Sequence, residues 1–416
     1  MAEPARPFAP GVGNPFANPA FLANPYPLYA MLRATSPVLR PPIPGYDGPG
    51  AVVLTRYADV EAVLRDPRFS VDRTRAHVVR AFSDRFPRQL LEGPDGFRTM
   101  LMTDPPDHTR LRHLVSRAFT PRRVEERLQP RIAALVDELL AAARERRELD
   151  VMRDFAEPLP AIVIAELLGV PAQDHRKFKQ WSSELLAEGP ARAFEPGAQE
   201  RTTALFLRLR GYMRDIVTER RSTPGDDLIS GMIEAQEERD ALSDGELIST
   251  SLLLLIAGHE TTTNLIGNGL LALLRNPDQL ERLRREPDLL DNAIEELLRY
   301  DSPVQATIRI ATEDVAIGGA TIPKEAATIV LLGAANRDPA VFAEPDRLDL
   351  ARENVRHLSF GLGTHFCLGA GLARLEARLA FRGLLALPKL ALATEAPEYR
   401  PNPFLRGLRS LPVALA

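Results

Sequence analysis

The side chain with the clearest capacity for chemistry is Cys367, the single cysteine of this 416-residue chain. Gly361 and Gly363 precede it, and the apolar helical pattern LARLEARLAFRGLLAL follows it from Leu372. Glycines permit turns that bring several backbone N–H groups near one atom, and the following helix directs its partly positive N-terminus to the same place. Both features lower the pKa of a thiol. The loop therefore suits a thiolate that binds iron and accepts hydrogen bonds.

The local pattern around this cysteine leaves other interpretations open. Cys367 could be a small buried hydrophobe, which is the usual place of a lone cysteine. A zinc site is a second alternative, although the pair His365-x-Cys367 has no matching pair elsewhere. A dinucleotide site is a third, but Gly369-x-Gly371 is followed by Arg374 where a third glycine is needed, and no strand leads into it.

A second reactive group interrupts a long apolar helix. The pair Ser243 and Glu246 forms a capping box, which predicts a helix that ends near Asn276-Pro277. Within it, Leu252–Ile256 is followed by Ala-Gly-His-Glu-Thr, in which Gly258, Glu260 and Thr261 oppose helix propensity or apolar burial.

Each residue of this interruption has a possible use. Gly258 would leave room for a small molecule against the helix. The hydroxyl of Thr261 can bond the preceding turn, and together with the carboxylate of Glu260 it can relay protons. The alternative is a solvent-exposed polar face, which for Glu260 alone would be the better interpretation. A helix long enough to cross a whole domain is expected to be buried. This favours a functional role for Gly258, Glu260 and Thr261 taken together.

Supporting charged residues occur at helical spacing. Glu296 and Arg299 lie at i and i+3, as surface ion pairs commonly do. His108 and Arg112 lie at i and i+4 on a helix that opens after two prolines. Arg309 lies in a predicted strand. Any one of these could be a solvated side chain.

The elements that position these residues are mostly helices. Helical periodicity covers residues 124–147, 154–169, 199–221 and 290–300, while short β-rich runs occupy residues 51–55, 307–311, 315–317 and 328–332. The composition, 45% hydrophobic and 26% charged, is that of a globular protein. A formal net charge of −4 disfavours nucleic-acid binding, and one cysteine excludes an internal disulfide. We expect one mainly α domain with small β-sheets over residues 1–416, with a proline-rich arm over residues 1–49.

The run Phe-x-x-Gly-x-x-x-Cys-x-Gly, from Phe360 to Gly369, resembles the haem-ligand loop of cytochromes P-450. The Ala-Gly-His-Glu-Thr segment resembles the acid–alcohol motif of the same family, and the similarity runs from about residue 22 to the C-terminus. The resemblance implies the helical P-450 fold and haem b, with Cys367 as axial thiolate and Phe360 packed beside it.

The resemblance also assigns roles to the other residues. Thr261 would contact dioxygen, Glu260 would supply protons, and Gly258 would border the cofactor. The haem propionates would be held by His108, Arg112, Arg309 and His365. Arg347, in Pro345-Asp346-Arg347, would join Glu296 and Arg299 to hold the cysteine loop.

The function that the resemblance implies is hydroxylation of an apolar small molecule with O2. Electrons would come from a ferredoxin and its reductase, or a flavodoxin-type donor, because the chain has no flavin or nicotinamide motif. A peroxide-driven peroxygenase and a haem sensor or carrier are the alternatives. We expect a cytoplasmic monomer without membrane anchor. We expect the substrate pocket to be lined by apolar residues, namely Phe82, Leu91, Phe97, Val304 and Phe404. We expect the redox partner to dock on a basic face, which comprises Arg110, Arg117, Arg122, Arg374 and Arg378.

Overall fold

The computed structural model describes residues 18–43, 46–81, 99–118, 126, 128–146, 148–187, 197–236, 242–387 and 390–415. The first part of the expected proline-rich arm and the pocket residues Phe82, Leu91 and Phe97 lie outside these ranges. None of the helices in the described ranges combines the length and apolar composition that a bilayer span requires.

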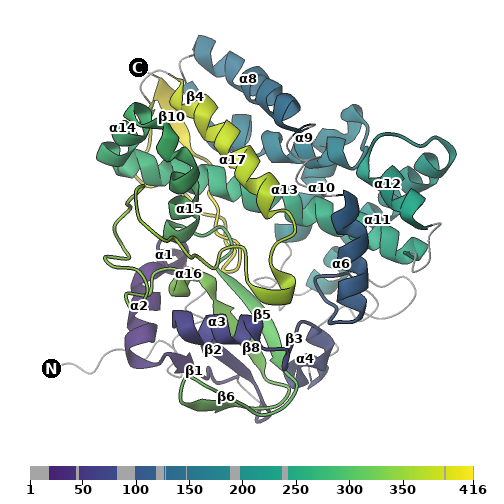
Figure 1. Ribbon diagram of the computed structural model, residues 1–416, viewed down its shortest axis with the longest axis vertical. Helices are drawn as coiled ribbons and strands as arrows, with labels where there is room; N and C mark the ends of the chain where they lie inside the picture. The colour runs from purple at the N-terminus through teal and green to yellow at the C-terminus, as the bar shows by residue number, and fades with distance from the viewer. Residues whose placement is uncertain are drawn as a thin grey trace.

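Helix α13 (Asp244–Arg275) is the long central helix that the sequence predicts. Ser243 accepts a hydrogen bond from the N–H of Glu246, and the Glu246 side chain accepts one from the N–H of Ser243, so the capping box forms. In Figure 1 the helix crosses the upper part of the molecule, and α17 (Ala370–Leu385) passes in front of it. Its buried residues extend along nearly its whole length and include His259 and Glu260 of the polar interruption, whereas Gly258 and Thr261 are half-buried and Ala257 is exposed.

The remaining helices surround α13. An apolar core joins it to α8, α9, α15 and α17, and a second core joins it to α11 and α12. The bounds of the helices other than α13 and α17 are α1 Pro19–Ala23, α2 Tyr26–Thr35, α3 Tyr57–Arg65, α4 His77–Ala81, α6 Asp107–Ala118, α8 Gln129–Arg146, α9 Pro158–Leu167, α10 His175–Ala187, α11 Ala198–Ser222, α12 Leu228–Gln236, α14 Pro277–Arg285, α15 Leu290–Tyr300 and α16 Leu332–Ala335.

Short helical turns of other types connect these elements. Met152–Ala156 is a π-helix directly before α9, and it overlaps the start of the α-helix that the periodicity predicts over residues 154–169. The 3-10 turns are Arg73–Arg75, Ala172–Asp174, Pro287–Leu289 and Gly363–His365.

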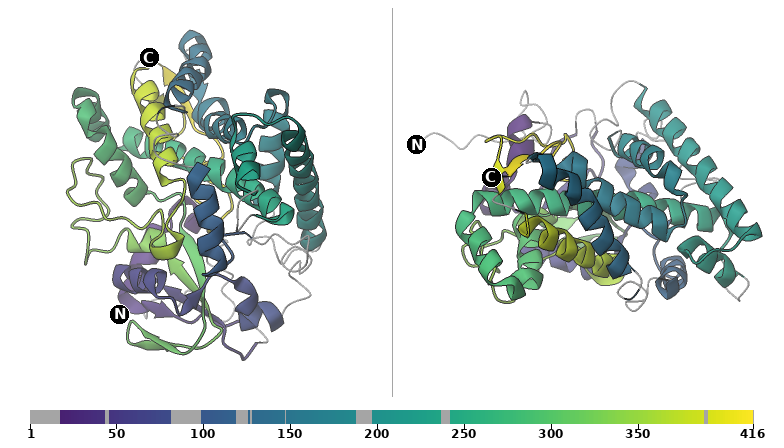
Figure 2. Two further views of the ribbon diagram at one scale, coloured as in Figure 1. Left: turned by 45° about the vertical axis from the view of Figure 1, so that its right-hand side comes forward. Right: turned by 90° about the horizontal axis from the view of Figure 1, so that it is seen from above.

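The main sheet lies below the helices in Figure 1 and has the strand order β1-β2-β8-β5-β3. Strands β2 and β8 are parallel, and the other neighbours are antiparallel. The left-hand view of Figure 2 also shows this sheet below the bundle around α13. Its strands are β1 Val38–Leu39, β2 Ala51–Leu54, β3 Phe69–Ser70, β5 Ala306–Ala311 and β8 Ala327–Leu331.

Two smaller sheets complete the fold. One has the order β4-β10-β9, and the other is the hairpin β6-β7. Their bounds are β4 Glu148–Asp150, β6 Val315–Ile317, β7 Ala320–Ile322, β9 Leu390–Leu392 and β10 Pro412–Leu415. The four predicted strand segments are confirmed as β2, β5, β6 and β8, and the fold class is confirmed as mainly α with small sheets.

Candidate active site

The loop before α17 is shaped by two glycines and a backbone hydrogen bond. Gly361 and Gly363 have φ of +67° and +70°, which L side chains rarely adopt. A Cβ at Gly363 would lie 2.7 Å from the carbonyl oxygen of Leu64, so the close approach to α3 also requires glycine. The N–H of Cys367 donates to the carbonyl of Phe360 at 2.9 Å. The predicted turn around Cys367 is therefore confirmed, with α17 beginning directly beyond it at Ala370.

The pKa of the Cys367 thiol shifts in the direction opposite to the sequence-based expectation. Burial raises the pKa of its thiol, although the backbone N–H of Gly369 and the nearby Arg112 and Arg374 act in the opposite direction. The loop alone therefore does not stabilise a free thiolate. A metal ion bonded to the sulfur would do so, because coordination deprotonates a thiol outright.

Arg374 connects α17 to α15 beside the cysteine loop. Its Nε and Nη2 donate to Glu295 Oε1 and Oε2 at 2.6 and 2.8 Å, a bidentate pair. Its guanidinium lies 4.6 Å from the ring centroid of Phe360. Burial raises the pKa of the Glu295 carboxyl, but hydrogen bonds from Arg374 and His357 outweigh it and lower the pKa to about 2. Phe360 thus packs against the helix that follows Cys367, a contact the sequence did not identify.

Glu296 and Arg299 form a fully buried pair that joins α15 to the segment from Asn336 to Arg352. Arg299 Nε and Nη2 donate to the Glu296 carboxylate at 2.7 and 2.8 Å, and both side chains have 0% exposure. The third member is Arg352, whose Nε lies 3.1 Å from Glu296 Oε2. The prediction that the side chain of Arg347 joins Glu296 and Arg299 was wrong.

The side chain of Arg347 turns outward to Asp349 and is 60% exposed. Only its backbone belongs to the network, since its carbonyl accepts from Arg299 and Arg352. The two arginines lie in an irregular loop, where spacing in the sequence does not fix side-chain direction.

On α13, the hydroxyl of Thr261 donates to the carbonyl of Ala257 at 3.1 Å, as expected for a threonine in mid-helix. A Cβ at Gly258 would lie 3.1 Å from Cγ1 of Ile164, so this glycine admits α9 close to α13. The contact of Gly258 with a cofactor or a bound small molecule stays a prediction. His259 is buried, with Nδ1 2.8 Å from the carbonyl oxygen of Leu255.

The carboxylate of Glu260 is 8% exposed and pairs with Arg400, whose Nη1 lies 2.6 Å from Oε1. The exposed polar face is therefore excluded as an explanation of Glu260. Arg400 lies in the C-terminal loop, 140 positions away, and no sequence pattern connects the two.

Four basic side chains from three parts of the chain meet near Cys367. The rings of His108 and His365 have centroids 4.1 Å apart. Burial, followed by the charges of His108, Arg309 and Arg112, lowers the pKa of His365 to about 3. Burial lowers the pKa of His108 as well, and its Nδ1 is buried without a hydrogen-bond partner in the described part of the chain.

Arg309 extends this basic cluster, defined as His108, Arg112, Arg309 and His365. Burial and, to a smaller extent, the positive charge of Arg73 lower the pKa of Arg309 to about 10. Arg73, in the 3-10 turn after β3, was not identified from the sequence. Adjacent basic groups that lower one another's pKa values, two of them arginines that stay charged, are suited to bind an anion from outside the chain.

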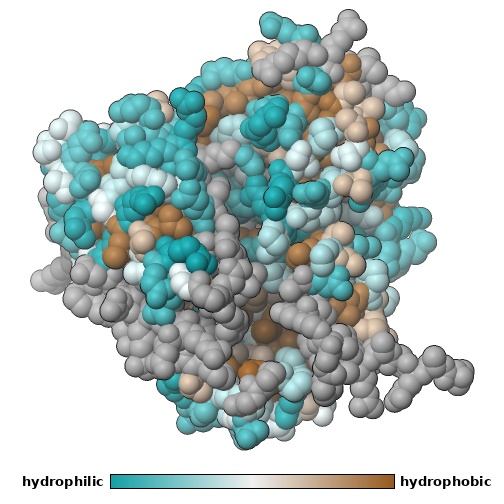
Figure 3. Space-filling model, turned by 180° about the vertical axis from the view of Figure 1, so that it is seen from behind, coloured by the Kyte–Doolittle hydropathy of each residue, from teal (hydrophilic) through white to brown (hydrophobic). Residues whose placement is uncertain are grey.

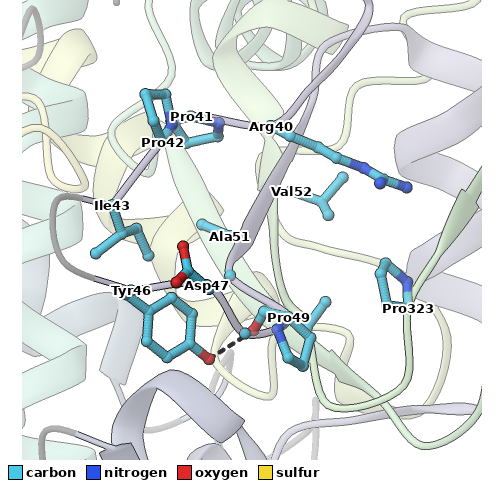
Figure 4. A pocket seen from close by; sticks show the side chains of 13 residues that line it. Arg40, Pro41, Pro42, Ile43, Tyr46, Asp47, Pro49, Ala51, Val52 and Pro323 are labelled. Atoms are coloured by element: carbon cyan, nitrogen blue, oxygen red, sulfur yellow. Dashed lines mark hydrogen bonds between the residues drawn. The ribbon is translucent and has the colours of Figure 1, made fainter. Parts of the chain in front are cut away.

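Other candidate sites receive less support. In the described residues no three His, Cys, Asp or Glu side chains form a group that could hold a metal ion. A surface cavity of about 260 Å³ lies between residues 40–52 and the loop of Pro323 and Ala326 (Figure 4), and none of the predicted site residues lines it. Figure 3 shows apolar side chains inside a hollow on the face opposite to that of Figure 1.

Three of the predicted docking arginines have acidic partners. Arg110 pairs with Glu246, Arg374 with Glu295, and Arg378 lies 3.6 Å from Asp291. The side chain of Arg117 and all of Arg122 lie outside the described residues. Of the predicted pocket residues, Phe404 packs partly against the cluster around Phe21 and Tyr29, and Val304 forms a β-bridge with Leu405.

A family model described as Cytochrome P450 matches residues 48–405. The chain belongs to the cytochrome P450 family. It is 46% identical to the vitamin D(3) 25-hydroxylase of Pseudonocardia autotrophica over 402 residues, which cover 95% of this chain and 94% of the relative. It is 43% identical to the 6-deoxyerythronolide B hydroxylase of Saccharopolyspora erythraea over 399 residues, with coverage of 94% and 96%.

A crystal structure of the myxobacterial cytochrome P450 CYP267B1 in complex with myristic acid has a TM-score of 0.86 to this structure. The two chains are 42% identical, and the match covers 96% of this chain and 98% of the other. The chain is thus a cytochrome P450 monooxygenase, and the cofactor of its family is haem b with a cysteine thiolate on the iron.

The residues present fit this cofactor. Haem b carries two propionates, and the basic cluster offers cations and a buried, unpartnered His108 Nδ1 in the described part of the chain. The sole cysteine of the chain stands at the start of α17, near Arg112 of that cluster.

Proposed function

We propose that this cytochrome P450 hydroxylates an apolar small molecule with O2, using electrons from a separate ferredoxin and its reductase or a flavodoxin-type donor. Relatives named for vitamin D(3) and 6-deoxyerythronolide B hydroxylation, and a neighbour in complex with myristic acid, support an apolar substrate. The apolar hollow of Figure 3 agrees with it. We include in this proposal that the chain acts as a monomer and a single domain.

The observation that carries the proposal is the loop of Cys367. Cys367 would hold the iron, Phe360 would support the loop, and His108, Arg112, Arg309 and His365 would hold the propionates. Haem b, when bound, supplies the activation of dioxygen.

Helix α13 would supply the residues that handle protons. Glu260 would carry a proton on its carboxylate, and Thr261 would direct its hydroxyl to the oxygen that receives it. Proton transfer by a positioned side chain of this kind contributes about 10²–10⁴-fold to rate. Gly258 keeps this part of α13 close to α9, which helps to exclude water.

The deciding experiment replaces Cys367 with serine. Reduced wild-type protein with carbon monoxide should give the strongly red-shifted Soret band of thiolate ligation, and Cys367→Ser should lose it. Thr364→Ala, a change at an exposed residue of the same loop, is the control and should keep the band. A Cys367→Ser variant that retains the band would overturn the assignment.

A second experiment separates the monooxygenase from a peroxide-driven enzyme or a haem carrier. Product formation should require added redox proteins and NAD(P)H. Thr261→Ala should bind haem normally and consume NAD(P)H while releasing more hydrogen peroxide and less product. Glu260→Gln should instead slow turnover, because the amide keeps the shape but cannot exchange a proton. Unchanged coupling in Thr261→Ala would remove this threonine from the mechanism.

A further inference from the structure

Glu260 is one end of a bridge of three charged side chains that reaches toward solvent. Arg400 Nη1 lies 2.6 Å from Glu260 Oε1, and Arg400 Nη2 lies 2.5 Å from Glu157 Oε1. The side-chain exposure is 8% for Glu260, 25% for Arg400 and 19% for Glu157. The inner carboxylate is therefore linked, through one guanidinium, to a carboxylate that water can reach.

The three residues come from three elements that meet at this point. Glu260 lies on α13, Glu157 lies between the π-helix Met152–Ala156 and α9, and Arg400 lies in the C-terminal loop. The hydroxyl of Thr263 donates to the carbonyl of Ala156 at 2.9 Å, which fixes the segment of Glu157 against α13. Both carboxylates are thus held relative to the same helix.

The loop that carries Arg400 is anchored to α13 as well. The N–H of Arg400 donates to the carbonyl of Gly407 at 2.9 Å, and Asn268 of α13 donates to the carbonyl of Arg406 at 2.9 Å. Gly407 packs so closely on Asn264 that a Cβ would lie 1.8 Å from its Oδ1. The backbone beneath Arg400 therefore cannot shift far without a break in these contacts.

From this geometry we infer that Arg400 is the residue that positions Glu260, and that the partly exposed Glu157–Arg400 pair marks the place where water returns a proton to Glu260. The guanidinium keeps its own protons and acts by holding both carboxylates in place. A guanidinium fork offers a fixed direction to each carboxylate, unlike a lysine. A carboxylate that gives up a proton in each turnover must be reprotonated from water, and the bridge leads from Glu260 to the two partly exposed groups. This inference rests on the proposed role of Glu260 as proton donor.

The test is a double-variant cycle on the haem-loaded enzyme. Arg400→Gln should lower product formation by about tenfold, part of the 10²–10⁴-fold that a general acid contributes. Arg400→Lys keeps the charge and should recover part of the loss. In the Glu260→Gln background, Arg400→Gln should add less than about a twofold loss, because residues that act as one unit are not additive. Glu157→Gln should give a smaller loss than Arg400→Gln.

The solvent isotope effect on turnover and the C–O stretch of the ferrous carbon monoxide complex report on the proton path separately from rate. Arg400→Gln should increase the isotope effect and change the width or position of the C–O band. Arg409→Gln is the matched control, since Arg409 lies in the same loop, is 63% exposed and lies 3.7 Å from Glu398. It should leave rate, isotope effect and band unchanged.

The possible outcomes distinguish the inference from the function beneath it. If Glu260→Gln keeps full turnover, the proposed role of Glu260 fails, and the positioning role fails with it. If Glu260→Gln slows turnover while Arg400→Gln changes neither isotope effect nor band, only the positioning role is overturned. Additive losses in the double variant would likewise reduce Arg400 to a structural residue.

Discussion

Two carboxylates, Glu296 and Glu260, are each held by arginine, and their surroundings differ. Glu296 is entirely buried and meets Arg299, whose remaining N–H groups donate to backbone carbonyls of the loop. Glu260 is nearly buried but meets Arg400, a quarter of which is exposed. The first carboxylate therefore lies within a closed network, and the second lies at the inner end of an open one.

The difference has an energetic meaning. Truncation of one partner in a buried, hydrogen-bonded pair leaves an uncompensated charge, which is strongly destabilising. A partly exposed pair exchanges its partner for water at much lower cost. The network of Glu296 and Arg299 is thus suited to rigidity, whereas the network at Glu260 is suited to proton exchange.

The largest effect is expected for Arg299→Met. The change leaves Glu296 buried without its closest partner and removes donors to the carbonyls of Asn336 and Pro345. We expect a loss of about 3–5 kcal/mol in the free energy of unfolding, together with loss of haem. Denaturant unfolding measures the first and the area of the carbon monoxide band the second.

Arg347→Gln provides the control for this experiment. Arg347 lies in the loop that Arg299 contacts, but its side chain is exposed and only its backbone carbonyl belongs to the network. We expect a change within about 0.5 kcal/mol. A large loss in Arg347→Gln, or a small one in Arg299→Met, would break the distinction between the closed network and its surface.

At the network of Glu260 and Arg400, Gly407→Ala should displace the C-terminal loop. The new Cβ would lie 1.8 Å from Asn264 Oδ1, so the helix or the loop has to move. We expect a loss of about 1–3 kcal/mol from overpacking, with reduced coupling of NAD(P)H to product. Gly211→Ala on α11 meets nothing within 4 Å and should gain about 0.5–1 kcal/mol. Equal effects from the two changes would argue against a tight fit between loop and helix.

The sequence predicted the regular elements and the chemistry of the cysteine loop better than the networks around them. The capping box at Ser243 and the strand periodicity depend on local physics, which neighbouring residues reveal. Arg352 was missed because an irregular loop has no period that tells which arginine points inward. The Glu260–Arg400 pair was missed because it is a tertiary contact between distant segments. Even the π-helix at Met152 has apolar spacing that resembles an ordinary helix.

A smaller effect is expected from acid. The carboxyl of Glu295 has its pKa lowered to about 2 from 4.5, so the folded state binds its proton less readily than the unfolded chain. Its contribution to stability is fully present above pH 4.5 and is lost as the pH falls toward 2. We expect about 1–2 kcal/mol, because the carboxylate is 26% exposed and partly screened.

Glu295→Gln should remove this contribution and flatten the dependence of unfolding free energy on pH between 4.5 and 2. Glu281→Gln, which removes the exposed partner of Arg284 on α14, is the control and should leave the slope unchanged. An unchanged slope in Glu295→Gln would mean that Arg374 and His357 do not stabilise the carboxylate.

The smallest effect on stability is expected for Arg378→Gln, which tests whether the side of the cysteine loop also serves a partner. Arg378 is one-third exposed on α17 and lies 3.6 Å from Asp291, whose side chain is 74% exposed, so the pair should contribute within about 0.5 kcal/mol. Its charge can nevertheless attract an acidic ferredoxin. Charges at such a surface act mainly on association and are screened beyond about 8 Å at physiological salt. Arg378→Gln should therefore slow reduction by ferredoxin at low salt and match the wild type at high salt. Arg153→Gln, at an exposed arginine of the π-helix before α9, should change neither rate. Reduction that is independent of salt in the wild type would exclude an electrostatic docking face at Arg378. The role of α17 would then be limited to the packing of the cysteine loop.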